Sequence, residues 1–190
     1  MPTRAPLLWS WHKRAMAGFT LIELMVTIGI AAVLMMVAAP NFVQFMRNAN
    51  LSDAVSSFIS AANTARANAM KTGQNTYLVP NDGAIGWSSG WLVYTDKNWD
   101  QAFTAGTDEL VARHDALDSS VTVTVPATSG GSPNSLVDGY LMFNGGGYPR
   151  LNNGGFSNGR IVLSNTQRSS AVIYDQTARV RSCKSGDVGC

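Results

Sequence analysis

One carboxylate is a candidate for chemistry because of its position in the sequence. Glu23 is followed by sixteen residues, 24–39, without a charged side chain. The whole apolar segment 19–39 would rise about 30 Å as a helix, which matches the hydrocarbon core of a bilayer. An ionised carboxylate is costly there unless a cation pairs with it. The sequence therefore predicts that Glu23 forms an ion pair.

Three basic side chains near the C-terminal end form a second candidate site, for anions. Arg179, Arg181 and Lys184 lie in a stretch, 147–190, that has six basic and two acidic residues, a charge of +4. If residues 178–181 form a strand, Arg179 and Arg181 project from one face, because side chains alternate. Such a face suits phosphate contacts and hence DNA. The alternative is a solvated edge strand whose charges prevent aggregation.

Catalytic and metal sites have little support in the sequence. His114 is followed by Asp115, but adjacent residues on a strand point to opposite faces. No His, Cys, Asp and Glu cluster has the spacing of metal ligands. The glycines at 145–147 lack the Lys-Ser/Thr pair and the helix of a phosphate-binding loop. We therefore expect no enzymatic activity, no catalytic residue, no metal and no cofactor.

Four aromatic residues at strand-like spacing allow two interpretations. Trp87, Trp91, Tyr94 and Trp99 could form a stacking platform for a ligand. At this spacing such side chains more commonly pack in a core or across strands. We expect core packing.

The charges that flank the apolar segment predict its orientation. Lys13 and Arg14 precede it, so the positive-inside rule keeps the residues before it in the cytoplasm and places the rest of the chain outside.

The chain has two cysteines, Cys183 and Cys190. In an oxidising periplasm, a pair so close in sequence is expected to form a disulfide.

A long helix and a set of short strands must position these residues. Apolar residues recur at spacings of three and four over residues 41–71, so an amphipathic helix continues the apolar one, with a kink at Pro40 and an end at Gly73. Beyond it, turn residues separate short strands. We expect an α+β fold, a long helix packed against an antiparallel sheet or sandwich, with strands at 76–79, 90–95, 110–114, 121–125, 140–143, 160–163, 171–174 and 178–181.

The N-terminal residues resemble a type III, or prepilin, signal. Gly18 matches the end of the basic leader, Phe19 the first mature residue and Glu23 the glutamate five residues into the mature chain; Pro40 matches the proline that bends pilin helices. The resemblance implies that a prepilin peptidase cuts between Gly18 and Phe19 and methylates the new amine. That amine, on a neighbouring subunit, would pair with Glu23 during assembly. An ordinary signal peptide would instead be cleaved after the apolar region, and no such site is evident before Pro40.

Later segments resemble the FimT/FimU/GspH family of minor pilins and minor type II secretion pseudopilins. They are ARANA (65–69), GWSSGWLVY (86–94), VARHD (111–115) and ARVRSC (178–183). The family closes with Gly-Arg-x-Arg, and Ala178 stands in place of the glycine, so the turn before Arg179 is expected to differ. Many relatives carry a cysteine near the strand equivalent to 77–80; its absence leaves Cys183 with Cys190 as partner.

This resemblance implies a structural role and a domain organisation. We expect a leader at 1–18, a transmembrane or filament-core half of the helix at 19–47, and a periplasmic globular domain at 48–190. The chain would be a single-pass inner-membrane protein whose partners are the prepilin peptidase and other pilins. Its expected function is that of a minor pilin in the initiating or tip complex of a type IV pilus. Two alternatives stay open: a DNA-binding pilin in natural transformation, as some FimT proteins are, and a GspH-like pseudopilin of type II secretion.

Overall fold

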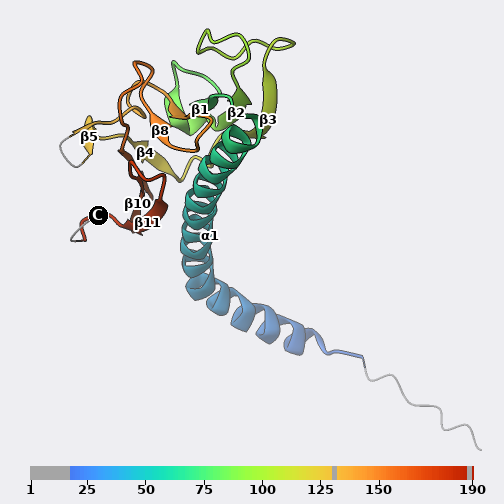
Figure 1. The fold of residues 1–190 in the computed structure, drawn as a ribbon. Coiled ribbons are helices and arrows are strands. Elements are labelled where there is room, and N and C mark those ends of the chain that lie inside the picture. The colour runs from blue at the N-terminus through green and yellow to red at the C-terminus, as the bar shows by residue number, and fades with distance from the viewer. Residues whose placement is uncertain (1–17, 130–131, 188–189) are drawn as a thin grey trace, which may run out of the picture. The chain divides into compact units, whose positions relative to one another are not determined.

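The structure, a computed structural model, describes residues 18–129, 132–187 and 190 (Figure 1). The predicted leader lies outside these residues except for Gly18. The chain divides into two compact units, Met1–Phe42 and Val43–Cys190. The described part of the first is called the apolar unit below, and the second the globular unit.

A single helix, α1 (Leu21–Thr72), contributes to both units. It ends where predicted: Gly73 has a φ of +70°, and its N–H donates to the carbonyl oxygen of Ala69 over 2.8 Å. A positive φ at this position closes a helix and suits glycine, which has no Cβ. Pro40 lies inside the helix.

Because α1 is bent, the described residues contain no unbent helix that is both long and apolar enough to cross a membrane. Two helical segments that meet at a bend, Leu21–Met36 and Ala38–Thr72, could do so together by length and composition. The bend lies one turn before Pro40, where the carbonyl of Met36 loses the N–H partner that a proline cannot supply. That Pro40 causes this bend stays a prediction.

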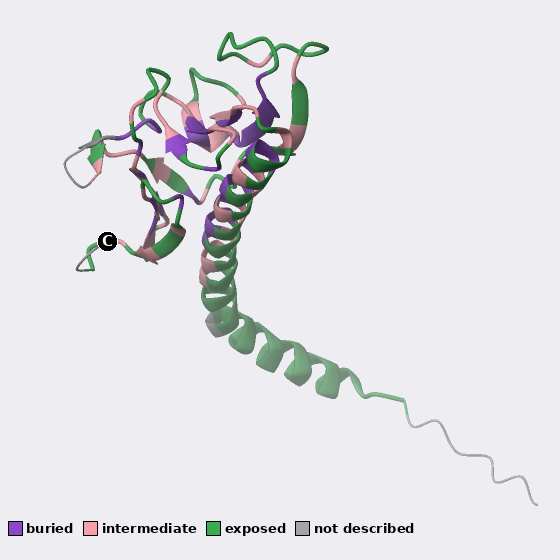
Figure 2. Ribbon diagram, in the orientation of Figure 1, coloured by how far each residue is buried: buried purple, intermediate pink, exposed green. Residues whose placement is uncertain are grey.

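The two parts of α1 differ in what covers them. From Phe19 to Phe42 every residue whose side chain is described is exposed. In the globular unit one face of the helix is buried at spacings of three and four, as an amphipathic helix requires (Figure 2). The buried positions are Leu51, Ala54, Val55, Phe58, Ala61, Ala62, Ala65, Asn68 and Ala69.

A five-stranded antiparallel sheet, in the order β3-β2-β1-β7-β8, packs against this face of the helix. Leu78 and Val93 point toward the helix, while Tyr77 and Tyr94 stack on the opposite face with ring centroids 5.4 Å apart. This alternation is the period-two pattern of a strand. The strands are β1 (Thr76–Pro80), β2 (Trp91–Thr95), β3 (Glu109–His114), β7 (Leu141–Phe143) and β8 (Pro149–Arg150).

A second antiparallel sheet, in the order β11-β10-β9-β4, completes the core through Ile161, Leu163 and Val172. Its strands are β4 (Thr122–Thr124), β9 (Gly159–Ser164), β10 (Ser169–Tyr174) and β11 (Val180–Lys184). A small pair, β5 (Thr128–Ser129) and β6 (Ser132–Pro133), and a 3-10 helix, η1 (Gly86–Ser89), complete the described elements. The predicted α+β fold, a long helix on antiparallel sheet, is confirmed.

Two expectations about individual elements are corrected. All eight predicted strands overlap observed ones, but the last begins at Val180 instead of residue 178. Trp87, Trp91 and Tyr94 are buried as expected, whereas Trp99 is 62% exposed. Trp99 lies in the loop between β2 and β3, where its φ of +63° takes it out of the strand pattern.

Candidate functional site

The N-terminal candidate residues lie on the first turn of α1. Thr20 precedes the helix, and its N–H and Oγ1 both donate to Oε2 of Glu23, each over 2.9 Å. The N–H of Glu23 in turn donates to Oγ1 of Thr20 over 3.3 Å. This reciprocal arrangement is a capping box, in which two backbone donors at a helix start are satisfied. Thr20 was not among the predicted site residues, although the Thr-x-x-Glu spacing could have identified it.

The surroundings of Glu23 are apolar and exposed. Its carboxylate borders a shallow hollow that is also lined by Phe19, Ile22, Val26 and Thr27. Phe19 is 83% exposed. Within the described residues no basic group lies within 4 Å of Glu23. The described residues of this part therefore present a carboxylate on an apolar surface without a basic group beside it.

At the basic candidate site, residues 178 and 179 belong to the hairpin turn between β10 and β11, so β11 begins at Val180 and not at residue 178 as expected. The N–H of Ala178 donates to the carbonyl oxygen of Asp175 over 2.9 Å, and Ala178 has a φ of +64°. Hairpin loops of three residues commonly end in such a left-handed residue, which is usually glycine. An alanine in this conformation costs about 1–2 kcal/mol. Ala178 thus takes a conformation that is usual for glycine, and the strand starts after it.

Local hydrogen bonds hold this turn. Oδ1 of Asp175 accepts from the N–H groups of Thr177 and Arg179 over 2.9 and 3.1 Å. Partial burial raises the pKa of Asp175, but hydrogen bonds from the Thr177 side chain and these backbone groups lower it more, so the pKa lies below its usual value. In addition, Arg66 of α1 donates to the carbonyl oxygen of Ala178 over 3.2 Å, which ties the turn to the helix.

The structure does not gather the three predicted anion-binding residues on one face. Arg179 lies in the turn, while Arg181 and Lys184 lie on β11, the edge strand of its sheet. Alternation along β11 puts Arg181 and Lys184 on opposite faces. Arg179 and Lys184 are five residues apart, a separation of about 16 Å along an extended chain. All three side chains are exposed.

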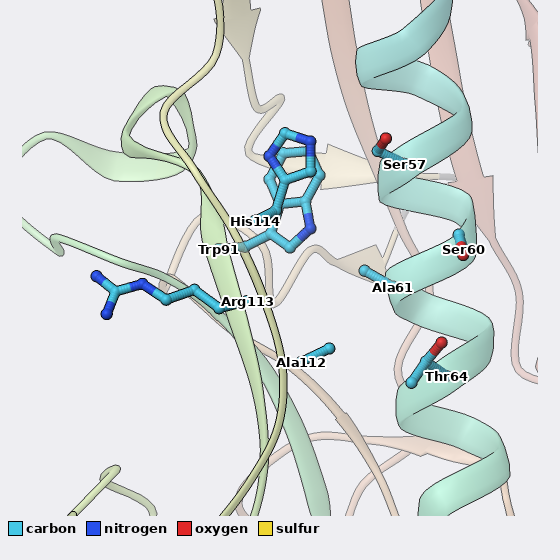
Figure 3. A pocket seen from close by; sticks show the side chains of 8 residues that line it. All are labelled: Ser57, Ser60, Ala61, Thr64, Trp91, Ala112, Arg113 and His114. Carbon is cyan, nitrogen blue, oxygen red and sulfur yellow. The ribbon is translucent and has the colours of Figure 1, made fainter.

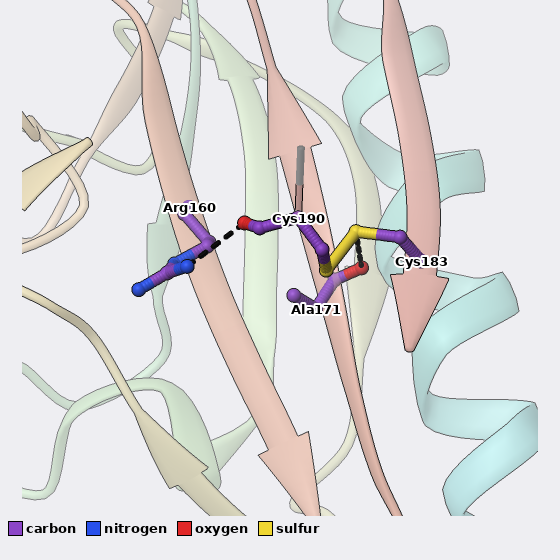
Figure 4. The surroundings of a disulfide bond; sticks show 4 residues. All are labelled: Arg160, Ala171, Cys183 and Cys190. Atoms are coloured by element: carbon purple, nitrogen blue, oxygen red, sulfur yellow. Dashed lines mark hydrogen bonds between the residues drawn. A yellow bond between two sulfur atoms is a disulfide. The ribbon is translucent and has the colours of Figure 1, made fainter. Parts of the chain in front are cut away.

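The two cysteines are joined in a disulfide at the end of the second sheet (Figure 4). Their Cα atoms are 5.9 Å apart. The carbonyl oxygen of Cys190 accepts a hydrogen bond from Nη1 of Arg160, on β9, over 2.8 Å. Because β10 lies between β9 and β11, the disulfide and this bond together hold Cys190 across three strands.

We expect the double variant Cys183→Ser, Cys190→Ser to lower the free energy of unfolding by about 2.5 kcal/mol, because an eight-residue loop is no longer closed in the unfolded chain. Urea unfolding of the oxidised wild type and the variant measures the difference. Thiol labelling of the unfolded, unreduced protein is the direct check: two reactive thiols would contradict the disulfide.

A shallow pocket between α1 and β3 contains the histidine considered above (Figure 3). Ser57, Ser60 and Thr64 line it from the helix. The ring of His114 stacks on Trp91 with centroids 4.4 Å apart, and no hydrogen bond joins it to the three hydroxyl groups within the described part of the chain. His114 thus has a packing role. The residues that the structure describes contain no group of His, Cys, Asp and Glu that could hold a metal ion.

Two family models match the chain. The model of the type II transport protein GspH matches residues 54–178, and that of the prokaryotic N-terminal methylation motif matches residues 13–39. The first covers the globular unit from the buried face of α1 to the turn at Ala178, and the second covers the Gly18, Phe19 and Glu23 segment. None of the curated proteins matches the chain.

Solved structures of two proteins are similar to this one. The type IV minor pilin FimU of Pseudomonas aeruginosa gives a TM-score of 0.53 at 13% identity, over 75% of this chain and 95% of FimU. A second crystal form of FimU gives 0.52 at 12% identity, over 72% and 94%. The minor pseudopilin EpsH of the type 2 secretion system of Vibrio cholerae gives 0.47 at 11% identity, over 73% and 99%. At these identities, the likeness to FimU shows a shared fold.

Proposed function

Since this chain belongs to the GspH family, whose members are minor pilins and pseudopilins of type IV pili and type II secretion, we propose that it serves as a minor pilin in the initiating or tip complex of a type IV pilus. The observation that carries the proposal is the division of α1. One half is apolar and exposed, whereas the other half is the buried support of a globular unit. A chain of this kind has a segment to bury among neighbours and a domain that stays outside.

The N-terminal segment supports processing before assembly. In this proposal a prepilin peptidase removes residues 1–18 and methylates Phe19. Residues 19–47 anchor the protein once through the inner membrane, and residues 48–190 form a periplasmic domain. On assembly the carboxylate of Glu23 pairs with the Phe19 amine of the adjacent subunit. A cation at that point offsets the cost of an ionised carboxylate in an apolar filament core.

A GspH-like pseudopilin of a type II secretion system is an alternative with equal support from the family match. The two readings differ in the neighbouring subunits. A photoreactive amino acid at Leu34, which is 64% exposed on the apolar half of α1, would capture those neighbours in the native host. We expect irradiation-dependent adducts with pilus subunits. Adducts with secretion pseudopilins would select the alternative, and a lack of any pilin-like adduct would contradict filament assembly.

Non-specific DNA binding in natural transformation is a further alternative, and the geometry restricts it. Arg181 and Lys184 lie on opposite faces of β11, so one duplex can meet at most two of the three candidate residues through one face. The slope of log affinity against log salt would then be no steeper than about −1.8, at −0.9 for each phosphate contact. A fluorescence titration with duplex DNA at several salt concentrations tests this. A lack of binding at low salt would exclude the role.

A further inference from the structure

We propose that one rim of the globular unit binds the phosphate headgroups of anionic phospholipids through Arg47, Arg168 and Lys184. This inference rests on the membrane anchoring in the proposed function. The membrane-proximal rim, as we call it, comprises these three residues with Ser169 and Ser170. In the sequence, Arg47 comes just after the start of the globular unit at Val43, and the other rim residues belong to the same unit.

Arg47 marks where the apolar part of the sequence ends. After Glu23 it is the first charged residue, because residues 24–46 have no charged side chain. Phe42 and Phe45, just before it, are 64% and 67% exposed. Arg47 lies eight residues beyond Ala39, about 12 Å along a helix. A long basic side chain near the end of a membrane span extends its charge into the headgroup layer, and aromatic residues favour that layer.

The turn between β9 and β10 is fixed beside Arg47. Nδ2 of Asn165 donates to the carbonyl oxygen of Arg47 over 3.1 Å and to Oδ1 of Asn48 over 3.0 Å. Oδ1 of the same Asn165 accepts from the N–H groups of Gln167 and Arg168 over 2.9 and 2.8 Å. One side chain therefore connects the helix at Arg47 to the turn that carries Arg168.

Lys184 joins the same rim from the edge strand. It pairs in register with Ser170, one residue beyond the start of β10 at Ser169. Arg168, Ser169, Ser170 and Lys184, with Gln167, line one hollow. These two cations and two hydroxyl groups can donate hydrogen bonds to phosphate oxygens. Within the described residues neither Arg168 nor Lys184 forms an ion pair.

Two acids limit how strongly this rim attracts anions. Asp118 lies near Arg47; a hydrogen bond from the Ser120 hydroxyl holds the pKa of Asp118 low, so it is ionised at neutral pH. Asp187 follows Lys184, and its N–H donates to the carbonyl oxygen of Lys184 over 3.2 Å. Three cations and two acids give the rim a net charge of +1. So small a charge attracts a single soluble phosphate ligand weakly, but it can hold phosphate groups that are present at high local concentration.

A bilayer is the source of phosphate that fits this position. Anchoring through the apolar segment holds the rim near the headgroups permanently, so that even weak contacts are occupied. Such contacts depend on anionic lipid and weaken with salt. These contacts would hold the globular unit against the membrane surface until the subunit is incorporated into a filament.

Two exposed glutamines provide a matched test. Gln167 lies in the turn at the rim, and Gln176 lies in the turn at the opposite end of β10. A photoreactive amino acid is placed at either position in the full chain, reconstituted in vesicles of phosphatidylcholine alone or with 30% phosphatidylglycerol. We expect at least fivefold more lipid adduct at position 167 with phosphatidylglycerol than without it, and little adduct at 176. Half-molar salt should remove most of the increase.

Charge variants separate the rim from overall charge. Arg168→Gln with Lys184→Gln should abolish the increase at position 167. Lys71→Gln with Arg113→Gln, exposed residues outside the rim, changes net charge equally and should preserve it. The inference would be overturned by equal adducts in both vesicles, by equal adducts at both positions, or by equal loss in the two double variants. If the chain still floats with the vesicles in these cases, its anchoring is supported. Failure to float would overturn the anchoring and the inference together.

Discussion

We expect Glu23→Ala and Glu23→Gln to enter filaments at less than about one-tenth of the wild-type level, because removing one partner of a buried ion pair costs several kcal/mol. Membrane association of both variants should be unchanged, because the segment loses only a charge and becomes more apolar. The amount in sheared filaments relative to the membrane fraction measures the effect.

The capping box makes the choice of substitution important. Glu23→Ala removes both the charge and the hydrogen bonds to Thr20, whereas a glutamine at this position can still complete a capping box. Thr20→Val is the complementary control, because it removes the hydroxyl and leaves the carboxylate. If the charge pairs with the Phe19 amine of a neighbour, both Glu23 variants fail and Thr20→Val assembles. Normal assembly of Glu23→Gln would instead assign Glu23 a capping role.

The second large effect is expected in the globular unit, at Phe58. Its side chain is 1% exposed and meets the rings of Trp87 and Trp91 edge-on, at centroid distances of 5.5 and 5.3 Å. Phe58→Ala should lower the free energy of unfolding by about 3–5 kcal/mol, because it leaves a cavity between the helix and the sheet. Urea unfolding of the full chain in detergent, followed by tryptophan fluorescence, measures this loss.

Phe45→Ala is the matched control for Phe58→Ala. Phe45 lies on the same helix but is 67% exposed, so its loss should leave the unfolding midpoint within about 0.5 kcal/mol of wild type. A loss below 1 kcal/mol for Phe58→Ala, or equal losses for both variants, would contradict the packing of α1 on the sheets.

The elements with a clear period could be predicted from the sequence. The helix was predictable because apolar residues at spacings of three and four continue into the segment that the core buries, and Gly73 supplies its end. The strands β1 and β2 were predictable because β-branched and aromatic residues make up most of each, and β10 because Val172, Ile173 and Tyr174 follow one another in it. Strands β5, β6 and β8 were not, because each has two residues, too few for a period, and depends on pairing with a partner.

The departures at the candidate sites have local causes. The spacing of Arg179 and Arg181 predicted a shared strand face, but Ala178 takes a left-handed conformation inside a hairpin turn, and Arg179 remains in that turn. Position 178 holds an alanine instead of the glycine that would have indicated a left-handed turn residue, so the turn could not be predicted from the sequence. Trp99 shows the same limit, since its φ of +63° could not be read from its residue type. The rim of Arg47, Arg168 and Lys184 depends on contacts between residues more than a hundred positions apart, which no local pattern contains.

The mass of the protein isolated from its native membrane tests the account most directly. Intact-mass and N-terminal peptide analysis should find a chain that begins at Phe19, shortened by 18 residues and carrying one N-methyl group on its amine. A basic leader, the Gly18-Phe19 junction and the match to the methylation motif all lead to this result. An uncut chain, or a chain cleaved beyond Ala39, would contradict processing as a pilin and with it the proposed entry into a filament.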